Sequence, residues 1–386
     1  MSSQSHQPES YLVVGGAGFV GSYIAQALVD RGEEHVAVYD SRVPDPRDLI
    51  KSVVYYCGDI CDEGKLVEVL NETAVTTVFH VVSPRLGLPT PVFTRVNVQG
   101  TRTLLNACRD KNLRVPVSKF IYTSSTGVVW TGKDLINVSE DQVAPPKKGY
   151  DIYHHTKAIA ERMVLDADNI DGMRTVALRP CGVTGPRDRQ MLLHMANALA
   201  RGEHKVQIGD NTNLVDWVYA GNVADAHLLA ADRLPLPFPS ESSPTSVFKS
   251  SAHPDPVAGQ AFFITNGTPM RQWDFSRMVW RALGAPAADF APGRVRRVPR
   301  WTAMLVATLA EAWAGVRGRR AAVTRLSVSY ATATQVYDID KARKALGYEP
   351  KVSIEEMIEM TAKWWKERGE AEYLATAIEA QGKKDE

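Results

Sequence analysis

Tyr153 and Lys157 lie four residues apart in the segment Tyr153-His-His-Thr-Lys157. On a helix this spacing places both side chains on one face. A free tyrosine has a pKa of about 10 and is a poor base at neutral pH, but a nearby ammonium group favours the phenolate. Such a pair could take a proton from an alcohol or return one to it. Pairs of this kind also arise by chance on solvated helix faces, so the rest of the sequence has to support the chemistry.

Two adjacent serines could complete this chemistry. Ser124 and Ser125 follow the apolar segment 119–123, which is typical of a buried strand. A hydroxyl group at this point could hold the same substrate oxygen whose proton the tyrosine moves. The spacing leaves the register open by one residue. We therefore assign the catalytic role to Ser125 and keep Ser124 as its rival and as a candidate substrate contact.

A glycine-rich segment near the N-terminus predicts a dinucleotide-binding site. Gly15, Gly18 and Gly21 follow the apolar run 12–14 and stand directly before a helical pattern. A strand, a tight glycine turn and a helix N-terminus together can hold a dinucleotide pyrophosphate. Asp40 lies nineteen residues after the last glycine, where a carboxylate can accept a hydrogen bond from a ribose hydroxyl. Together with the serines and the tyrosine–lysine pair, this turn predicts proton transfer at an alcohol beside a bound hydride acceptor.

Strands that alternate with helices must position these groups. The predicted strands are 12–14, 36–39, 52–56, 77–82, 119–123 and 174–178, with helices at 62–70, 94–110 and 150–168. This alternation indicates parallel βαβ units, in which ligands bind beyond the carboxyl ends of the strands. We therefore predict an α/β fold: a Rossmann-type doubly wound parallel sheet with a smaller, mainly C-terminal substrate-binding subdomain.

The chain is expected to divide by function along its length. The predicted NAD-binding core covers 10–182, with 214–232 and 261–265 returning to it. The predicted substrate-binding subdomain covers 183–213 and 266–370. Residues 234–258 are rich in proline and serine without periodicity, which predicts a surface loop, and 1–9 and 371–386 are predicted tails.

Composition bounds the class of protein. The chain has 386 residues, of which 44% are hydrophobic and 23% charged, as in soluble globular proteins. The net charge of +1 gives no electrostatic reason for a nucleic-acid partner, and none is expected. The four cysteines show no metal-type spacing and are interpreted as reduced thiols, and the polar N-terminus predicts no secretory signal. His80, His154 and His155 lack partners at metal-ligand spacing, so we predict structural roles for them and no metal site.

Several short motifs over residues 11–365 resemble those of the extended short-chain dehydrogenases/reductases. Besides the features above, they are Gly58-Asp59-Ile60, Asn97-Val-Gln-Gly-Thr101, Arg179-Pro180 with Gly185-Pro186, and Ala342-Arg-x-x-Leu-Gly-Tyr348-x-Pro350. Within this group the chain is similar to the 3β-hydroxysteroid dehydrogenases, in particular to the fungal sterol-4α-carboxylate 3-dehydrogenases (decarboxylating). The segments that carry this resemblance are 79–84, 120–125, 185–190, 213–227 and 262–267.

The resemblance implies roles for individual residues. Tyr153 would be the base in alcohol oxidation, Lys157 its partner and a ribose contact, and Ser125 the group that orients the substrate oxygen. Asn97 would support Lys157 through a water molecule. The implied dinucleotide contacts are Gly15, Gly18, Phe19, Val20, Gly21, Asp40, Arg42, Asp59, Ile60, Val81, Val82, Ser83, Asn97, Tyr153, Lys157, Pro180 and Val183.

Two residues bear on the choice between NAD and NADP. Asp40 favours NAD, because a carboxylate accepts a hydrogen bond from the ribose 2′-hydroxyl but repels a 2′-phosphate. Arg42 favours NADP, because a guanidinium group two residues further on could meet that phosphate. We predict NAD and leave NADP as the alternative.

The activity implied by the resemblance is oxidation of a 3β-hydroxyl on a sterol-like substrate, with loss of a 4α-carboxylate, as in C4 demethylation during sterol biosynthesis. A substrate carboxylate needs a cation, and Arg85, Arg187 and Arg189 are the candidates. Apolar residues at 191–195 and Trp217 favour an apolar substrate. Three alternatives stay open: a triterpenoid or meroterpenoid 3-alcohol dehydrogenase, a sugar-nucleotide epimerase or dihydroflavonol-type reductase, and a non-catalytic dinucleotide-binding sensor or scaffold. A homodimer is a family expectation.

The apolar segment 301–316 raises the question of a membrane. It has sixteen residues and a single acid, Glu311, and is shorter than the roughly twenty residues that a span requires. Flanking arginines and tryptophans at its two ends are typical of a helix that lies at a membrane interface. The alternative is a helix that covers the substrate pocket. We predict peripheral contact with the cytoplasmic face of the endoplasmic reticulum, and otherwise a cytoplasmic protein.

Overall fold

A seven-stranded sheet, parallel throughout, forms the centre of the fold. The computed structural model describes residues 9–235, 256–317, 321 and 323–371. The strands are β1 (Tyr11–Val14), β2 (Val36–Asp40), β3 (Val53–Cys57), β4 (Thr77–His80), β5 (Lys119–Thr123), β7 (Arg174–Pro180) and β12 (Gln260–Ile264). Their order is β12-β7-β5-β4-β1-β2-β3, so the winding reverses between β1 and β4. This is the doubly wound arrangement, and the predicted fold class is confirmed.

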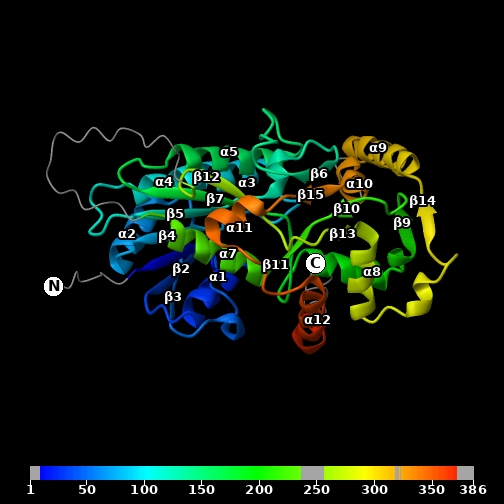
Figure 1. Cartoon of the computed structure of the whole chain (residues 1–386), viewed down its shortest axis with the longest axis horizontal. Coiled ribbons are helices and arrows are strands. Elements are labelled where there is room, and N and C mark those ends of the chain that lie inside the picture. The colour runs from blue at the N-terminus through cyan, green and yellow to red at the C-terminus, as the bar shows by residue number, and fades with distance from the viewer. Residues whose placement is uncertain (1–8, 236–255, 318–320, 322, 372–386) are drawn as a thin grey trace.

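Helices cover both faces of this sheet (Figure 1). Helices α1 (Phe19–Asp30) and α7 (Ala220–Arg233) pack together on one face. Helices α2 (Glu63–Thr73), α4 (Thr101–Cys108) and α5 (Ile152–Asp166) pack on the other. Successive strand side chains point to opposite faces and enter two different cores. Burial on both faces explains why these strands are continuous apolar runs in the sequence.

One helix differs from the prediction. The segment 94–110 is expected to be a single α-helix, but the chain forms α3 (Thr90–Phe93), the π-helix η2 (Thr94–Gly100) and then α4. The π-helix packs against α5 and carries Asn97, which is buried. Short π-helical turns occur often at functional sites, where they re-aim a side chain.

A second sheet and a cluster of helices make up the rest of the molecule. The four strands, in order, are β13 (Met270–Arg271), β10 (Leu214–Val215), β15 (Gln335–Tyr337) and β6 (Leu135–Val138). Strand β10 therefore lies outside the seven-stranded sheet. Within the segment 214–232, helix α7 is the part that packs on that sheet. Strands β6 and β15 and helix α10 (Arg325–Thr332) were not predicted from the sequence. The predicted proline-rich loop 234–258 lies mostly outside the described residues, as do most of both tails.

Shorter elements connect these two parts. Helices α6 (Met191–Ala200), α8 (Gln272–Ala282) and α12 (Ile354–Trp364) share one hydrophobic core. Two short parallel pairs are β8 (Gly182–Thr184) with β11 (Trp217–Tyr219) and β9 (Val206–Ile208) with β14 (Arg296–Val298). Helix α11 (Asp340–Leu346) packs on α7, and α9 (Arg300–Val316) packs on α10.

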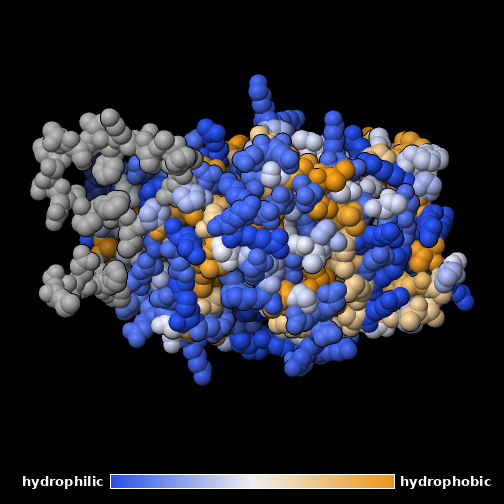
Figure 2. All heavy atoms as spheres, viewed as in Figure 1, coloured by the Kyte–Doolittle hydropathy of each residue, from blue (hydrophilic) through white to orange (hydrophobic). Residues whose placement is uncertain are grey.

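The surface is mostly hydrophilic in the view of Figure 2, with hydrophobic residues scattered in small groups over the centre and right of the view. Within the part of the chain that the structure describes, no helix is both long enough and apolar enough to cross a membrane.

Candidate active site

Tyr153 and Ser125, the predicted catalytic pair, lie near each other at the carboxyl end of β5. They come from different elements, and the Ser125 hydroxyl is close enough to the Tyr153 phenol to influence its pKa. Ser125 begins the 3₁₀ turn η3 (Thr126–Val129), and its hydroxyl also accepts a hydrogen bond of 3.1 Å from the amide of Gly127. Burial raises the pKa of Tyr153, and the nearby Ser125 hydroxyl acts in the opposite direction.

Lys157 lies one helical turn after Tyr153 and is 2% exposed. Its ammonium donates a hydrogen bond of 2.5 Å to the carbonyl oxygen of Thr123 and lies 4.3 Å from the ring centroid of Tyr122. Burial lowers the pKa of this ammonium to about 7, although the carboxylate of Glu161 acts in the opposite direction. The ammonium of Lys157 thus points toward the end of β5. Ser125, and not Lys157, is the neighbour that acts to lower the pKa of Tyr153.

Two further polar residues of the predicted site have different surroundings. Ser124 is 3% exposed, and its hydroxyl has no hydrogen-bond partner among the described residues. The Asn97 amide group donates to the hydroxyl of Thr156, which lies next to Lys157 in the chain. The Oδ1 atom of Asn97 is buried and has no partner among the described residues. An amide oxygen in this position can accept a hydrogen bond from a water molecule beside Lys157.

The glycine turn has the backbone geometry that a pyrophosphate site requires. Gly15 has φ +93°, and a Cβ atom there would lie 2.9 Å from the amide nitrogen of Val82. A Cβ atom at Gly21 would lie 2.3 Å from the carbonyl oxygen of Gly15. Gly18 is the N-cap of α1 and supplies no side chain to the first amides of the helix, which include those of Phe19 and Val20. These free amides and the positive end of the helix dipole suit a diphosphate.

The Asp40 side chain is fixed beside this turn. Its Oδ2 atom accepts a hydrogen bond of 3.1 Å from the amide of Ala17. Burial raises the pKa of Asp40, whereas the amide of Ala17 and the charge of Arg42 act in the opposite direction. The second oxygen of this carboxylate lies beside the hydroxyl of Ser41, at 3.3 Å. The glycine turn therefore holds the Asp40 carboxylate in place at the carboxyl end of β2.

The other implied dinucleotide contacts also lie at strand ends. Val81, Val82 and Ser83 follow β4, while Pro180 ends β7 and Val183 belongs to β8. These positions, together with the uncapped α1 and the cradle at Gly15, fit a nicotinamide dinucleotide laid across the carboxyl edge of the sheet.

Asp59 and Ile60, two more of the implied dinucleotide contacts, interact with neighbouring elements. The Asp59 carboxylate accepts a hydrogen bond from the amide of Cys61 and forms an ion pair of 2.6 Å with Arg95. Ile60 is buried and contacts the backbone position of Gly100 on the π-helix. Asp59 thus has partners for both of its oxygens within the chain.

The three candidate arginines for a substrate carboxylate have different partners. The guanidinium of Arg187 lies 4.8 Å from the ring centroid of Tyr23 on α1. Arg189 forms an ion pair of 3.3 Å with Asp48. Burial lowers the pKa of Arg85, and the charges of Arg42 and Arg189 act in the same direction, so Arg85 lies near two other cations. It has no carboxylate partner among the described residues.

The apolar residues after β8 serve mainly as core. Leu192 and Met195 are buried between α6, α8 and α12, so their apolar character reflects packing and is weaker support for an apolar substrate than the sequence indicated. Trp217 stacks on Phe275 with ring centroids 3.9 Å apart.

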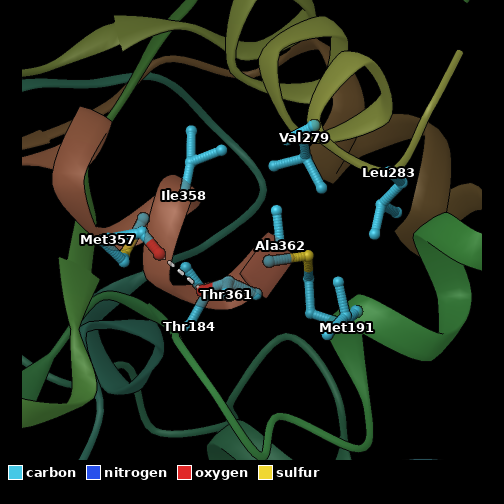
Figure 3. Close-up of a pocket in the computed structure, with 10 residues that line it drawn as sticks. Thr184, Met191, Val279, Leu283, Met357, Ile358, Thr361 and Ala362 are labelled. Atoms are coloured by element: carbon cyan, nitrogen blue, oxygen red, sulfur yellow. Dashed lines mark hydrogen bonds between the residues drawn. The ribbon is translucent and has the colours of Figure 1, made fainter. Parts of the chain in front are cut away.

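A small pocket among these helices, shown in Figure 3, is lined by Met191 and other residues. Its free volume of about 10 Å³ is roughly that of one water molecule and cannot hold a sterol.

Comparisons with known proteins show the family of this chain. The model of the 3-beta hydroxysteroid dehydrogenase/isomerase family matches residues 12–291. Sterol-4-alpha-carboxylate 3-dehydrogenase (decarboxylating) of Candida albicans is 34% identical over 377 residues, which are 94% of this chain and 99% of that protein. The Schizosaccharomyces pombe protein of the same description is 36% identical over 92% of this chain and 98% of its own length. The human protein is 30% identical, over 92% and 88%.

Solved structures agree at the level of the fold. An epimerase from Methanothermobacter thermautotrophicus has a TM-score of 0.68 and 21% identity, with 95% of each chain covered. UDP-glucose 4-epimerase of Thermus thermophilus, solved in complex with NAD, has a TM-score of 0.64 and 23% identity over 92% of this chain and 99% of that one. The resemblance drawn from the motifs is confirmed by the family model and by relatives matched along nearly the whole chain: this protein belongs to the 3-beta hydroxysteroid dehydrogenase/isomerase family.

Proposed function

We propose that the protein oxidises the 3β-hydroxyl of a 4α-carboxysterol to the 3-ketone with a nicotinamide dinucleotide as acceptor, and that the product loses the carboxylate as CO₂. The observation that carries the proposal is the placement of Ser125 close to Tyr153, one helical turn from Lys157, in a fold whose glycine turn suits a dinucleotide. The full-length similarity to sterol-4-alpha-carboxylate 3-dehydrogenases supports this substrate class.

Each of the three residues has a distinct part in the oxidation. Tyr153 takes the hydroxyl proton of the substrate as the carbon–hydrogen bond breaks, and Ser125 holds the same oxygen by a hydrogen bond. Lys157 would hold a ribose hydroxyl of the dinucleotide and add positive charge on the side of the tyrosine. A nicotinamide dinucleotide held by the glycine turn would supply the hydride acceptor. Tyr153 is partly buried, which limits the contact of its hydroxyl with bulk water and makes these neighbours important for its proton transfer.

Loss of the carboxylate needs no further catalytic group. Oxidation at C3 gives a β-keto acid, in which the new ketone accepts the electron pair that the departing CO₂ leaves behind. The resulting enolate then takes up a proton. We propose Arg85 as the cation that meets the substrate carboxylate, because it has no carboxylate partner among the described residues. Arg187 and Arg189 are weaker candidates, because one stacks on Tyr23 and the other is paired with Asp48.

We propose NAD rather than NADP as the preferred acceptor. The Asp40 carboxylate is held at the end of β2 by the amide of Ala17. A 2′-phosphate on the ribose beside it would meet this negative charge, whereas a 2′-hydroxyl would donate to it. Asp40→Ala should therefore raise the KM for NAD while lowering the KM for NADP, and Arg42→Ala should mainly weaken NADP. Equal changes in both constants for both variants would contradict this assignment.

We also propose that α9 lies against a lipid surface. Its outer face exposes Trp301, Leu305, Leu309, Trp313 and Val316, while Ala303 and Ala307 pack on α10. Arg300 begins this helix, and the guanidinium of Arg317 lies over the ring of Trp313 at its end. An exposed apolar stripe with cations at both ends is typical of an interfacial helix. A peripheral position would bring a membrane-dissolved substrate close to the site.

Flotation with anionic vesicles tests this contact. Leu305→Asp with Leu309→Asp should abolish co-flotation, whereas Ile136→Asp, at an exposed apolar residue on β6, should leave it unchanged. Equal flotation of all variants would contradict the role of α9.

A substrate screen tests the reaction. NADH formation and trapped CO₂ are followed with 3β-hydroxysterols that carry or lack a 4α-carboxylate and with triterpenoid 3-alcohols. We expect turnover with stoichiometric CO₂ for the carboxysterol. Turnover of triterpenoid alcohols alone would assign the enzyme to a different pathway, and binding of NAD without any turnover would favour a sensor or scaffold.

A further inference from the structure

Helix α10 holds the beginning of α5 through two adjacent side chains. The hydroxyl of Ser329 lies 3.1 Å from that of Tyr150, and the hydroxyl of Tyr330 lies 2.6 Å from Nε2 of His154. These contacts fall on either side of Tyr153. Helix α10 packs under α9, outside the seven-stranded sheet that carries the catalytic residues (Figure 1).

The imidazole of His154 lies against the catalytic pair. A Cβ atom at Gly127 would lie 2.0 Å from this ring, so the ring fills the space beside the Gly127 backbone. The amide of the same glycine donates to the hydroxyl of Ser125. His154 also follows Tyr153 directly in the chain, and the two ring centroids are 5.2 Å apart. Any shift of this imidazole would therefore move the supports of both catalytic hydroxyls.

The polar contacts of His154 determine which of its two ring nitrogens carries the proton. Its Nδ1 atom lies 2.9 Å from a carboxylate oxygen of Asp151, an electrostatic contact rather than a well-aligned hydrogen bond. Asp151 is also the N-cap of α5 and accepts a hydrogen bond from the amide of His154. The negative charge favours a proton on Nδ1, so Nε2 accepts from the hydroxyl of Tyr330. Burial raises the pKa of Tyr330 well above its ordinary value, which keeps this hydroxyl a donor.

The ring of Tyr330 is fixed as well as its hydroxyl. Trp130 is fully buried, and its ring centroid lies 4.4 Å from that of Tyr330 and 4.7 Å from that of Tyr150. The aromatic packing would hold a phenylalanine at position 330 in nearly the same place. The hydroxyl can therefore be removed while the packing is kept.

We propose that Tyr330 is a positioning residue for alcohol oxidation, which acts through His154 to fix Tyr153 and Ser125 relative to each other. The inference rests on the proposed function, in which these two hydroxyls share one substrate oxygen. It assigns no proton transfer to Tyr330. Its consequence is that a helix outside the nucleotide-binding half sets the alignment of the catalytic tyrosine.

The test is a double-mutant cycle with Tyr330→Phe and His154→Leu. Tyr330→Phe should lower kcat about tenfold, because small misplacements of catalytic groups are costly, and should leave the KM for NAD within twofold. In the His154→Leu background the same substitution should have no further effect, because the path to Tyr153 is already broken. His154→Gln, which retains an acceptor for Tyr330, should recover part of the loss. Ser329→Ala, on the same helix but bonded to Tyr150, should change kcat by less than twofold.

Three results would overturn the proposal: an unchanged kcat in Tyr330→Phe, an additive loss in the double variant, or an equal loss in Ser329→Ala. Hydrogen exchange of the amides 152–156 gives a readout that does not need a substrate. Tyr330→Phe should speed exchange there more than Ser329→Ala does, and equal rates would also contradict the proposal. If the wild-type chain oxidises no 3β-hydroxysterol, the proposed function fails, while the exchange experiment still tests the contact.

Discussion

Replacement of Asp216 by asparagine should make the protein more stable at pH 8 but not at pH 5. Asp216 lies between β10 and β11 and is 2% exposed. Its Oδ2 atom accepts a hydrogen bond of 2.8 Å from the amide of Tyr337, while Oδ1 has no partner among the described residues. Burial raises the pKa of this carboxyl from 3.8 to about 7, although the amide of Tyr337 acts in the opposite direction.

The sign and the size of the effect follow from linkage. The folded chain binds this proton more tightly than the unfolded chain, so the free energy of unfolding falls as the pH rises from about 4 to about 7. The full difference is at most about 4 kcal/mol, at 1.36 kcal/mol per pH unit. An asparagine retains an acceptor for Tyr337 but buries an unpaired amide group, which costs about 1–3 kcal/mol. We therefore expect Asp216→Asn to gain about 1–3 kcal/mol at pH 8 and to gain nothing at pH 5.

Urea unfolding followed by tryptophan fluorescence at pH 5, 6, 7 and 8 measures this difference. Asp210→Asn is the matched control, because Asp210 is exposed and its pKa is lowered by hydrogen bonds from Thr212. The control should lose rather than gain stability at high pH. If Asp216→Asn differed from the wild type by the same amount at every pH, the carboxyl would not titrate as described and the reasoning would be refuted.

Three further predictions concern the site itself. Tyr153→Phe should lower kcat by about 10²-fold or more. Its affinity for NAD, measured by fluorescence titration, should stay within about threefold of the wild-type value. A kcat comparable to that of the wild type would exclude the tyrosine as the base. Ser125→Ala should lower kcat far more than Ser124→Ala does, because it is the Ser125 hydroxyl that lies close enough to Tyr153 to influence its pKa; steady-state kinetics that rank the two variants in the reverse order would shift the register by one residue. Gly21→Ala should abolish NAD binding in calorimetry, because its Cβ atom would lie 2.3 Å from the Gly15 carbonyl oxygen and displace the turn, and normal affinity would show that the turn can adjust.

Local patterns allowed much of the fold to be predicted. Continuous apolar runs predicted six strands of the central sheet to within a few residues, because strands buried on both faces leave a strong signal. The segment 261–265, which overlaps the seventh strand, was assigned to the same core. The glycine turn and the tyrosine–lysine spacing were also readable, because each depends on residues close together in the chain. The same reasoning missed β6, β15 and α10. The two strands are short and pair only with distant segments, and the capping box of Thr324 and Ser327 before α10 is a signal that could have been found.

The sequence by itself determined which groups can do chemistry here and that they lie at one edge of a parallel sheet, since strand order and helix periodicity depend on neighbouring residues. Only the tertiary structure decided which partners they have. It brought Ser125 close to Tyr153, turned the ammonium of Lys157 toward Thr123, and paired Arg189 with Asp48. The physical reason is distance along the chain. A side chain chooses its partner among groups that packing brings close, and those groups are separated by up to 141 residues in these three contacts.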